Sequence, residues 1–502
     1  MEELLIEHPA SSLSTEENDS LEMFSEVLST LDKEQIPRLA KTILQRLQPD
    51  NSASNTTPTI DEPMHGSCHI LFPITFNADL RWVVKIPVNG TEDKWDELSA
   101  SALTSEANAM QLLKRETTIP LPEVLDFSRT TQNSLRCPYI VMTFISGMPL
   151  YDVWFGNRVN GTDPETTRAR RVRALEAISS AMLQLDKFSF PTSGRPLFGG
   201  EGNLSGVGNM RLPDHEAMLD RWFINEDPSD DPIYVEGAPS RDPKAYYTHM
   251  LDIHPTQEPF PKGVMMLLRE LISWIPSEGG IGDHADPAGT LLEHVPFSQR
   301  LVRLLQRLFG WLMPSPSKAS HPFVLAHPDF DIQNFIVSPE GELLSIIDWD
   351  GISFVPRTLG NQRYPSWLTR DWDPGMYGYQ ECTDQDAEPE CVWEDSPESL
   401  AYYRRVYHDI MARRLAEAGR ASEARLCRMS LVAHNLAIAA DDPHCRNGIL
   451  RKMVDEIWAA AGDDGEVNLI DLAPMFAENN VDAAVMERLR KGFGILLSRE
   501  GL

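Results

Sequence analysis

Residues 327–350 of the chain read HPDFDIQNFIVSPEGELLSIIDWD. Two short apolar runs, 335–337 and 343–347, flank a Pro-Glu-Gly turn, and this pattern predicts a β-hairpin. A hairpin brings its two open ends together. We therefore expect Asn334, which precedes the first strand, and Asp348, which follows the second, to lie side by side.

The side chains at these two ends carry oxygen atoms that suit a divalent metal ion. Asn334 offers an amide oxygen and Asp348 a carboxylate, the hard ligands that Mg²⁺ selects. Asp329 lies close before Asn334 in the sequence and can reach the same place in a tight loop. Phosphoryl transfer needs such a set, because one carboxylate orients and deprotonates an attacking hydroxyl while metal ligands neutralise the transferred group. The segment therefore predicts Mg²⁺ at Asn334 and Asp348, with Asp329 as the catalytic residue.

A second pattern lies in the N-terminal half. Residues 80–86 predict a strand that carries Lys85, and residues 98–115 predict a helix in which Glu106 interrupts the apolar stripe. An unpaired buried carboxylate is costly, so we expect a cationic partner, and Lys85 is the obvious one. A Lys held by a Glu and directed at the nucleotide phosphates is the kinase arrangement. The plainer alternative is a surface Glu and a Lys at a strand edge.

The composition restricts the other partners of the protein. Lys plus Arg is 45 against 75 Asp plus Glu, a formal net charge of -30. Such a field disfavours binding to nucleic acid and to anionic membranes. The sequence has no apolar run of about eighteen residues that could span a bilayer. Residues 1–20 contain no Lys or Arg, which argues against a secretory signal or transit peptide, so we expect a cytoplasmic protein.

At 502 residues the chain exceeds one compact domain, and its texture changes along the sequence. We expect an N-terminal appendage that holds one helix at about 20–47 and a flexible linker, then a β-rich lobe with one helix, then a mainly helical lobe. A stretch rich in Pro, Gly and Asp within the last lobe predicts an insert of short helices and loops. The expected bounds are 1–58 for the appendage, 59–147 for the N-lobe, 148–502 for the C-lobe, 323–350 for the catalytic hairpin and about 188–296 for the insert.

The loop H-x-D-x-x-x-x-N at 327–334 and the Ile-Ile-Asp-Trp run at 346–349 resemble the aminoglycoside phosphotransferase family, in particular its fungal proteins. Further similar segments are WVVKIP at 82–87, YIVMTFISG at 139–147 and YPSWLTRDWDP at 364–374. The resemblance covers roughly residues 60 to 460. It implies an α+β, bilobal, protein-kinase-like fold, with a small antiparallel β-sheet N-lobe, a large mainly helical C-lobe and ATP between them.

The resemblance also assigns roles to single residues. Asp329 matches the catalytic base, Asn334 and Asp348 the metal ligands, Lys85 the lysine that pairs with the phosphates, and Glu106 its helix partner. His327 would hold the conformation of the loop, although a merely packed histidine would look the same.

The same resemblance implies an adenine site, in which backbone groups of Thr143, Phe144 and Ile145 hydrogen-bond the base and Val83 packs over its ring. Asp371 and Asp373 lie where the family has its substrate pocket, and could bind a cation or equally cap the next helix.

Some residues differ from the family pattern, and others are explained equally well by a purely structural role. Asp331 and Asp350 flank the metal site and could add metal ligands or contact a substrate amine, but for each of them we favour a solvated or capping role. Pro328 stands where the family usually has Gly and protein kinases have Arg, so we expect no regulation by activation-loop phosphorylation. The loop over the phosphates is represented only by Gly66-Ser67-Cys68-His69, which is far from G-x-G-x-x-G.

The sequence thus predicts a phosphotransferase that uses ATP and Mg²⁺ and acts on a hydroxyl- or amine-bearing small molecule. The sparse glycine loop favours an alternative, a catalytically inactive kinase-like scaffold. A protein kinase is a weaker alternative, because no A-P-E segment follows Asp348. The sequence indicates neither the phosphoryl acceptor nor the oligomeric state.

Overall fold

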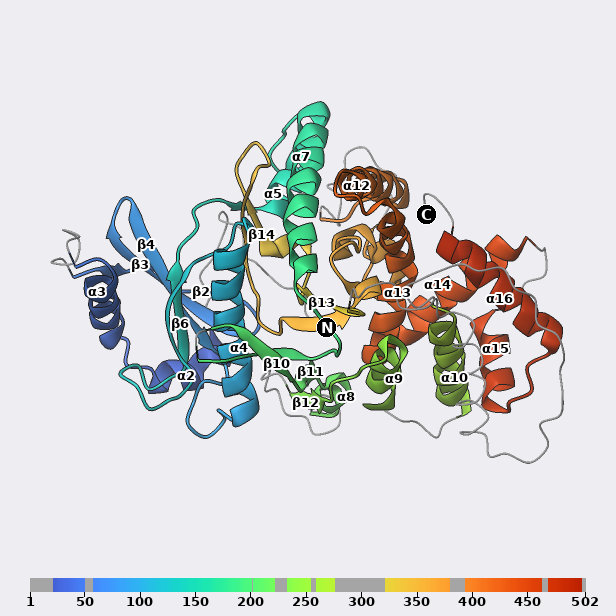
Figure 1. Cartoon of the computed structure of the whole chain (residues 1–502), viewed down its shortest axis with the longest axis horizontal. Helices are drawn as coiled ribbons and strands as arrows, with labels where there is room; N and C mark the ends of the chain where they lie inside the picture. The colour runs from blue at the N-terminus through green and yellow to red at the C-terminus, as the bar shows by residue number, and fades with distance from the viewer. Residues whose placement is uncertain are drawn as a thin grey trace. The chain divides into compact units, whose positions relative to one another are not determined.

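Figure 1 shows a computed structural model of the chain, which describes residues 21–49, 57–200, 202–221, 233–253, 259–275, 321–379, 393–462 and 468–498. The chain divides into two compact units. Unit 1 comprises Met1–Gln184, Gly194–Ala238 and His327–Ser353, and unit 2 comprises Leu185–Ser193, Pro239–Ala326 and Phe354–Leu502. The sequence-based boundaries at residues 58 and 147 stay predictions. Outside the described residues lie 1–20 of the predicted appendage, 50–56 of its linker, and 201, 222–232, 254–258 and 276–296 of the predicted insert.

Unit 1 contains an antiparallel sheet. Its strands are β1 (Thr59–Ile60), β2 (Met64–His65), β3 (His69–Asn77), β4 (Leu80–Pro87), β5 (Val124–Ser128) and β6 (Tyr139–Thr143). They follow the order β1-β3-β4-β6-β5, with β2 paired to β3. The turn between β3 and β4 forms because the Asn77 side chain accepts hydrogen bonds from the backbone N–H groups of Asp79 and Leu80.

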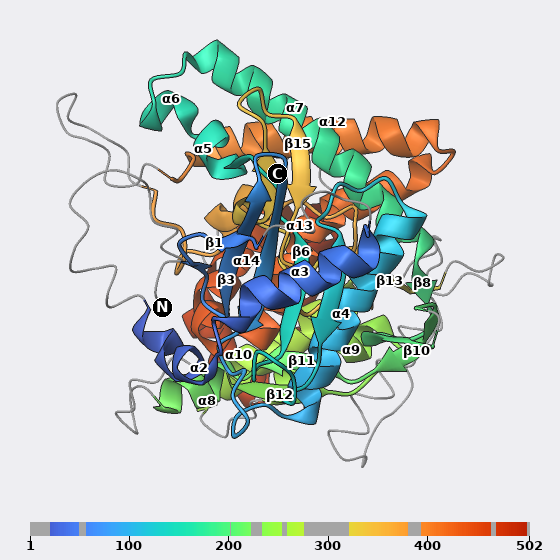
Figure 2. The same ribbon diagram turned by 90° about the vertical axis from the view of Figure 1, so that its left-hand side faces the viewer.

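The two faces of β4 pack against different helices, because successive residues of a strand point to opposite sides. Trp82, Val84 and Ile86 share one hydrophobic core with α3 (Gln35–Leu47), which crosses the strands in Figure 2. Lys85 points to the other face and contacts α4 (Glu97–Glu116). Figure 1 accordingly shows α3 and α4 on opposite sides of the sheet.

The N-terminal helical segment belongs to the core of unit 1. We predicted one helix at about 20–47 in an appendage, whereas the structure has η1 (Glu22–Phe24), α2 (Ser25–Thr30) and α3. Pro37 lies in the first turn of α3, where a missing N–H is tolerated; in one continuous helix its ring would clash with the carbonyl four residues earlier. The helix therefore breaks at Leu31, which is extended, and both pieces can pack on the sheet.

The predicted insert contains β-strands, which the sequence did not indicate. In unit 1, β9 (Arg195–Phe198) pairs with β10 (Leu204–Gly208), and β11 (Met210–Pro213) pairs with β12 (Tyr234–Gly237), both antiparallel. The expectation of short helices and loops was wrong here, because Gly and Pro within these short strands hide the alternating pattern. Helix α8 (His215–Leu219) lies between β11 and β12 in the sequence.

The rest of unit 1 holds a second, smaller sheet in the order β15-β14-β7 and several helices. These elements are β7 (Met148–Pro149), α5 (Leu150–Trp154), α6 (Gly156–Val159), α7 (Pro164–Met182), η5 (Ile332–Asn334), β14 (Phe335–Val337) and β15 (Leu343–Ile346). The strands β14 and β15 are those that the sequence predicted within the catalytic hairpin at 323–350.

Unit 2 is mainly helical. Its helices are α9 (Pro243–Ile253), α10 (Pro259–Trp274), η6 (Arg357–Leu359), η7 (Ser366–Leu368), η8 (Arg370–Trp372), α12 (Pro397–Glu417), η9 (Ala421–Glu423), α13 (Ala424–Asp441), α14 (Pro443–Ala461), α15 (Leu469–Ala477) and α16 (Ala483–Ser498). It also holds β8 (Ser189–Phe190) and β13 (Phe323–Ala326), and the short segments η3 (Leu183–Lys187) and β16 (Ser353–Pro356) join the two units in sequence.

The fold class predicted from the sequence is confirmed at this level. The chain is α+β, with antiparallel sheets and a mainly helical part. Within the described ranges, we find no helix with the length and apolar composition that a bilayer crossing requires.

Candidate functional site

The predicted hairpin brings Asn334 next to the segment that carries Asp348. Phe335 pairs with Ile346, and the backbone N–H of Ile347 donates to the carbonyl oxygen of Asn334 at 2.9 Å. At the closed end, Gly341 has a φ of 84° and donates its N–H to the carbonyl oxygen of Ser338. The predicted hairpin geometry is thus confirmed.

The loop before β14 fixes the Asp329 carboxylate through amide side chains. Asn334 Nδ2 donates to Asp329 Oδ2 at 2.7 Å and to the Asp329 carbonyl oxygen at 2.9 Å. Gln333 Nε2 donates to the same Oδ2 at 2.8 Å. The sequence analysis did not single out Gln333. Because these bonds orient the Asn334 amide, its Oδ1 is the atom that remains suited to bind a metal ion.

Asp348 adopts a backbone conformation that few residues other than Gly accept. Its φ is 59°, in the left-handed region, which is uncommon and costs conformational energy in a residue other than glycine. Its carboxylate is 48% exposed and accepts a hydrogen bond from Lys85 Nζ at 3.0 Å. Partial desolvation alone would raise the pKa of Asp348, but the Lys85 ammonium outweighs this effect and holds that pKa well below its usual range. Asp348 is therefore an anion at neutral pH.

The predicted pair of Lys85 and Glu106 is present and buried. Lys85 Nζ donates to Glu106 Oε1 at 2.7 Å, and the two side chains are 7% and 4% exposed. Burial raises the pKa of Glu106 to about 7, and the neighbouring Lys85 limits this rise. Burial would lower the pKa of Lys85, but Asp348 and Glu106 together raise it above its usual range. The ammonium of Lys85 therefore stays charged between two carboxylates that are far apart in the sequence.

His327 links the loop to the returning strand. Its Nε2 lies 2.9 Å from the carbonyl oxygen of Ile347, so this nitrogen carries the proton and donates it. The buried ring also packs edge-on against Trp349, with ring centroids 4.6 Å apart. These contacts agree with the loop-orienting role that the sequence analysis assigned to His327, which stays a prediction.

The predicted adenine site lies at the end of β6. The N–H groups of Thr143 and Phe144 donate to the carbonyl oxygens of Glu123 and Arg81. A base at this segment would have to use its carbonyl groups or the Ile145 amide.

Val83 lies on the same strand as Lys85, two residues away, and therefore on the same face of the sheet. This is the face that a nucleotide held by Lys85 would have to approach. The adenine-binding roles of Val83 and of the segment at 143–145 stay predictions.

A cluster of charged residues beside Lys85 was missed by the sequence analysis. Arg211, on β11, lies 2.6 Å from Asp350, and His69 lies 3.8 Å from the same carboxylate oxygen. Burial, and then the Lys85 ammonium, lower the pKa of His69 to about 3, so the ring is neutral at neutral pH. The solvated or capping role that we favoured for Asp350 was wrong. The sequence did not indicate a role for Arg211, because no pattern in the insert predicts which element the Arg211 side chain contacts.

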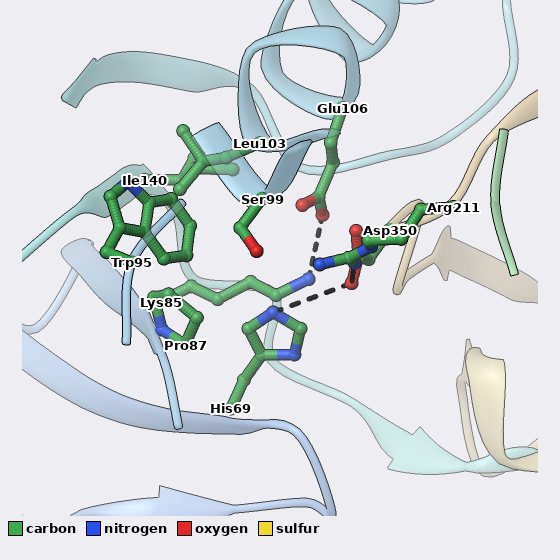
Figure 3. A pocket seen from close by; sticks show the side chains of 10 residues that line it. All are labelled: His69, Lys85, Pro87, Trp95, Ser99, Leu103, Glu106, Ile140, Arg211 and Asp350. Carbon is green, nitrogen blue, oxygen red and sulfur yellow. Dashed lines mark hydrogen bonds and ion pairs between the residues drawn. The ribbon is translucent and has the colours of Figure 1, made fainter. Parts of the chain in front are cut away.

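Figure 3 shows the pocket that these residues line together with residues of β4 and α4. Lys85, Glu106, Arg211 and Asp350 supply its charged groups. Pro87, Trp95, Leu103 and Ile140 supply its apolar wall, and His69 and Ser99 complete the lining.

The remaining candidates have structural contacts of their own. Asp371, in unit 2, accepts two hydrogen bonds from Arg404 at 2.6 and 3.0 Å, so binding a substrate cation would require Arg404 to move. Asp373 is buried and accepts from the backbone N–H of Gly375. Their substrate contacts stay predictions. Asp331 caps η5 by accepting from the backbone N–H of Ile332, as we favoured.

The donor atoms at the hairpin suit a magnesium nucleotide. In the described part of the chain, no three His, Cys, Asp or Glu side chains gather closely enough to form a metal site. Mg²⁺ is ordinarily held by one or two carboxylates together with substrate phosphates and water. One carboxylate from Asp348 and one amide oxygen from Asn334 agree with that pattern, whereas a structural zinc ion would need four protein ligands.

No family model matches the chain. Its curated relatives include two proteins named "Altered inheritance of mitochondria protein 9, mitochondrial". The protein of Kluyveromyces lactis is 22% identical over 302 residues, covering 59% of this chain and 48% of that protein. The protein of Lodderomyces elongisporus is 21% identical over 388 residues, covering 70% and 57%. The chain therefore spans about half the length of the curated relatives it matches.

Solved structures that align with the chain include aminoglycoside and small-molecule kinases. A thermostable mutant of aminoglycoside phosphotransferase APH(4)-Ia, in complex with AMP-PNP and hygromycin B, is 14% identical, with 92% of this chain and 99% of that chain covered and a TM-score of 0.34. Plasmodium vivax ethanolamine kinase is 10% identical, with coverages of 96% and 99% and a TM-score of 0.37.

The relatives contradict the predicted location. We expected a cytoplasmic protein, but both relatives carry the word mitochondrial in their names. The expectation rested on the lack of Lys and Arg in residues 1–20, and a local composition of this kind does not determine the compartment. The chain is thus similar to mitochondrial proteins.

Proposed function

We propose that the protein is a phosphotransferase that uses ATP and Mg²⁺ and acts on a hydroxyl- or amine-bearing small molecule. One observation carries the proposal. The Lys85 ammonium contacts Glu106 at 2.7 Å and Asp348 at 3.0 Å. A charged group held between two acids in this way is suited to align nucleotide phosphates next to a metal ligand.

On the nucleotide side, the residues of unit 1 would act by position and charge. Lys85 would contact the phosphates, and Glu106 would fix its direction from α4. Asp348 and the Oδ1 atom of Asn334 would hold Mg²⁺, which neutralises charge on the phosphates when it is bound. Adenine would lie near Val83 and the segment at 143–145.

On the acceptor side, Asp329 would orient the acceptor group and accept its proton. The amides of Gln333 and Asn334 hold one of its oxygens at 2.8 and 2.7 Å. These bonds fix the direction of the Asp329 carboxylate toward an acceptor. A positioned base of this kind contributes about 10² to 10⁴ in rate.

A catalytically inactive, kinase-like scaffold is the second candidate. The turn at 66–69, which would lie over the phosphates, contains one glycine only, so its backbone would make few contacts with them. Against this candidate, a scaffold has no physical need for Lys85 to contact both Glu106 and Asp348, or for Asn334 to hold Asp329. A protein kinase is a weaker candidate, because no A-P-E segment follows Asp348 in the sequence.

Transfer of a labelled phosphoryl group distinguishes these candidates. The full chain is incubated with Mg²⁺ and γ-labelled ATP, once with a small-molecule extract and once with a protein extract. The matched variants are Asp329→Asn and Asp331→Asn, since Asn caps a helix as well as Asp does and both changes lie in one loop.

We expect the unaltered protein and Asp331→Asn to label a small molecule, and Asp329→Asn to be slower by about 10² or more. No labelled small molecule would favour the scaffold. Labelling of the protein extract alone would favour a protein kinase, and full activity of Asp329→Asn would reject the assigned base.

We also propose a mitochondrial location, which the names of the curated relatives support. Subcellular fractionation of the native protein tests it. Recovery with a mitochondrial marker is expected, and recovery with cytosolic markers alone would reject it.

A further inference from the structure

The inserted hairpins of unit 1 lie against the helix that carries Glu106. The chain segments at β9 and β11 both contact α4. The hydroxyl of Ser105, next to Glu106 in the sequence, donates to the carbonyl oxygen of Pro196 on β9 at 2.9 Å. The insert is therefore joined to the nucleotide side of the site.

Arg211 is the residue through which this insert contacts the metal-binding segment. Its guanidinium is 9% exposed and donates to Asp350 Oδ2 at 2.6 Å, and the Asp350 side chain is 16% exposed. The guanidinium also lies over the ring of Tyr234, 4.2 Å from its centroid. Strand pairing between β11 and β12 holds both residues, so the direction of Arg211 is fixed by the hairpin.

We infer that Arg211 is a positioning residue of the nucleotide site, which acts through Asp350 to hold Asp348 in its metal-binding conformation. The inference rests on the proposed function and adds to it a role for the insert. Arg211 itself need not touch the metal ion or the nucleotide.

The backbone between Asp348 and Gly351 explains why such support is needed. Asp348 has a φ of 59° and Gly351 a φ of 82°, so two of four consecutive residues are left-handed. A non-glycine residue in this region persists only where surrounding structure holds it. Asp350 lies between these two residues and is approached by Arg211 and, at 3.8 Å, by His69.

The energetics of buried ion pairs agree with a positioning role. Desolvation offsets much of the attraction between the two charges, so such a pair contributes little to stability. Its best-attested role is to select one specific arrangement of the chain. Partners of metal ligands in other proteins act in this way, and their loss commonly weakens metal affinity about 10- to 100-fold.

Calorimetric titration of AMP-PNP separates the possible roles of Arg211. The full chain is titrated with excess Mg²⁺ and again with EDTA, and the ratio of the two dissociation constants gives the gain in affinity due to the metal ion. The variants are Arg211→Gln, Arg211→Lys, Asp350→Asn and the double variant Arg211→Gln/Asp350→Asn. Arg46→Gln, which removes the ion pair between Arg46 on α3 and Asp126 on β5, is the control.

We expect Arg211→Gln to lower the metal-dependent gain about 10-fold or more while the affinity in EDTA is unchanged. Asp350→Asn should act in the same direction. The double variant should be no worse than the more affected single variant, because both changes break one interaction. Arg211→Lys should restore part of the gain, and Arg46→Gln should match the unaltered protein.

Other results overturn the inference in recognisable ways. An equal loss with Mg²⁺ and with EDTA would show that Arg211 contacts the nucleotide directly. An unchanged metal-dependent gain in the folded variants would show that the ion pair has only a structural role. In both cases the proposed function stands. Absence of binding by the unaltered protein would overturn the proposed function, and with it this inference.

Discussion

Replacing Lys85 by Met tests the buried charge cluster of unit 1. Met keeps the length of the side chain and removes its charge, so Glu106 is left at 4% exposure without its cation. Breaking a buried ion pair from one side costs about 3 to 5 kcal/mol. The pKa of Glu106 is already raised to about 7, so the orphaned carboxyl can take up a proton at neutral pH. We therefore expect the lower end, about 3 kcal/mol of unfolding free energy.

A double-mutant cycle gives this prediction a matched control. In Glu106→Gln, Lys85 keeps Asp348 at 3.0 Å, so the loss should be smaller, about 1 to 2 kcal/mol. The double variant Lys85→Met/Glu106→Gln should lose much less than the sum of the two single changes. Contacting residues commonly show such non-additivity, at about 0.5 to 3 kcal/mol.

The assay must report on unit 1 alone. Hydrogen exchange of the β3, β4 and α4 amides at increasing urea concentration gives the free energy of opening of these elements. A Lys85→Met variant within about 0.5 kcal/mol of the unaltered protein would refute the buried cluster, as would strictly additive single and double changes.

Three further predictions concern pH, the hairpin and unit 2. Because the folded-state pKa of Glu106 is raised from 4.5 to about 7, the unfolding free energy should fall as the pH rises between these values. Glu106→Gln should lack this component, and identical pH profiles would contradict it. Gly341→Ala should destabilise unit 1 by about 1 to 3 kcal/mol, because a Cβ there would lie 2.7 Å from the Arg170 carbonyl oxygen and φ is 84°; thermal unfolding that matches the unaltered protein would contradict this. Arg404→Met should cost unit 2 about 3 kcal/mol by leaving Asp371 unpaired, and addition of Asp371→Asn should recover part of it; no recovery in urea unfolding would show that the pair is not the cause.

Each contact that the sequence predicted is indicated by a pattern within a short stretch of the chain. The hairpin before Asp348 follows from a turn between two apolar runs, and needs no knowledge of the rest of the chain. The pair of Lys85 and Glu106 is distant in sequence, but an acid in the apolar stripe of a helix demands a partner. Burial therefore made a long-range contact predictable in this one case.

The contacts that the sequence did not predict lack such a signal. Arg211 meets Asp350 across 139 positions, and the short Gly- and Pro-containing strands of the insert gave no strand pattern. The left-handed φ of Asp348 depends on tertiary support, which no local propensity encodes. In the N-terminal segment, the sequence predicted one helix at about 20–47, yet only the structure shows that the apolar face of this segment packs on the sheet.

Metal-dependent nucleotide binding at Asp348 tests the central claim most directly. Calorimetric titration of AMP-PNP, with Mg²⁺ and with EDTA, is compared between the unaltered protein and Asp348→Asn. The proposed site predicts that Mg²⁺ tightens binding to the unaltered protein and that Asp348→Asn loses most of this gain. Absence of binding at millimolar nucleotide, or an equal gain in both proteins, would contradict it.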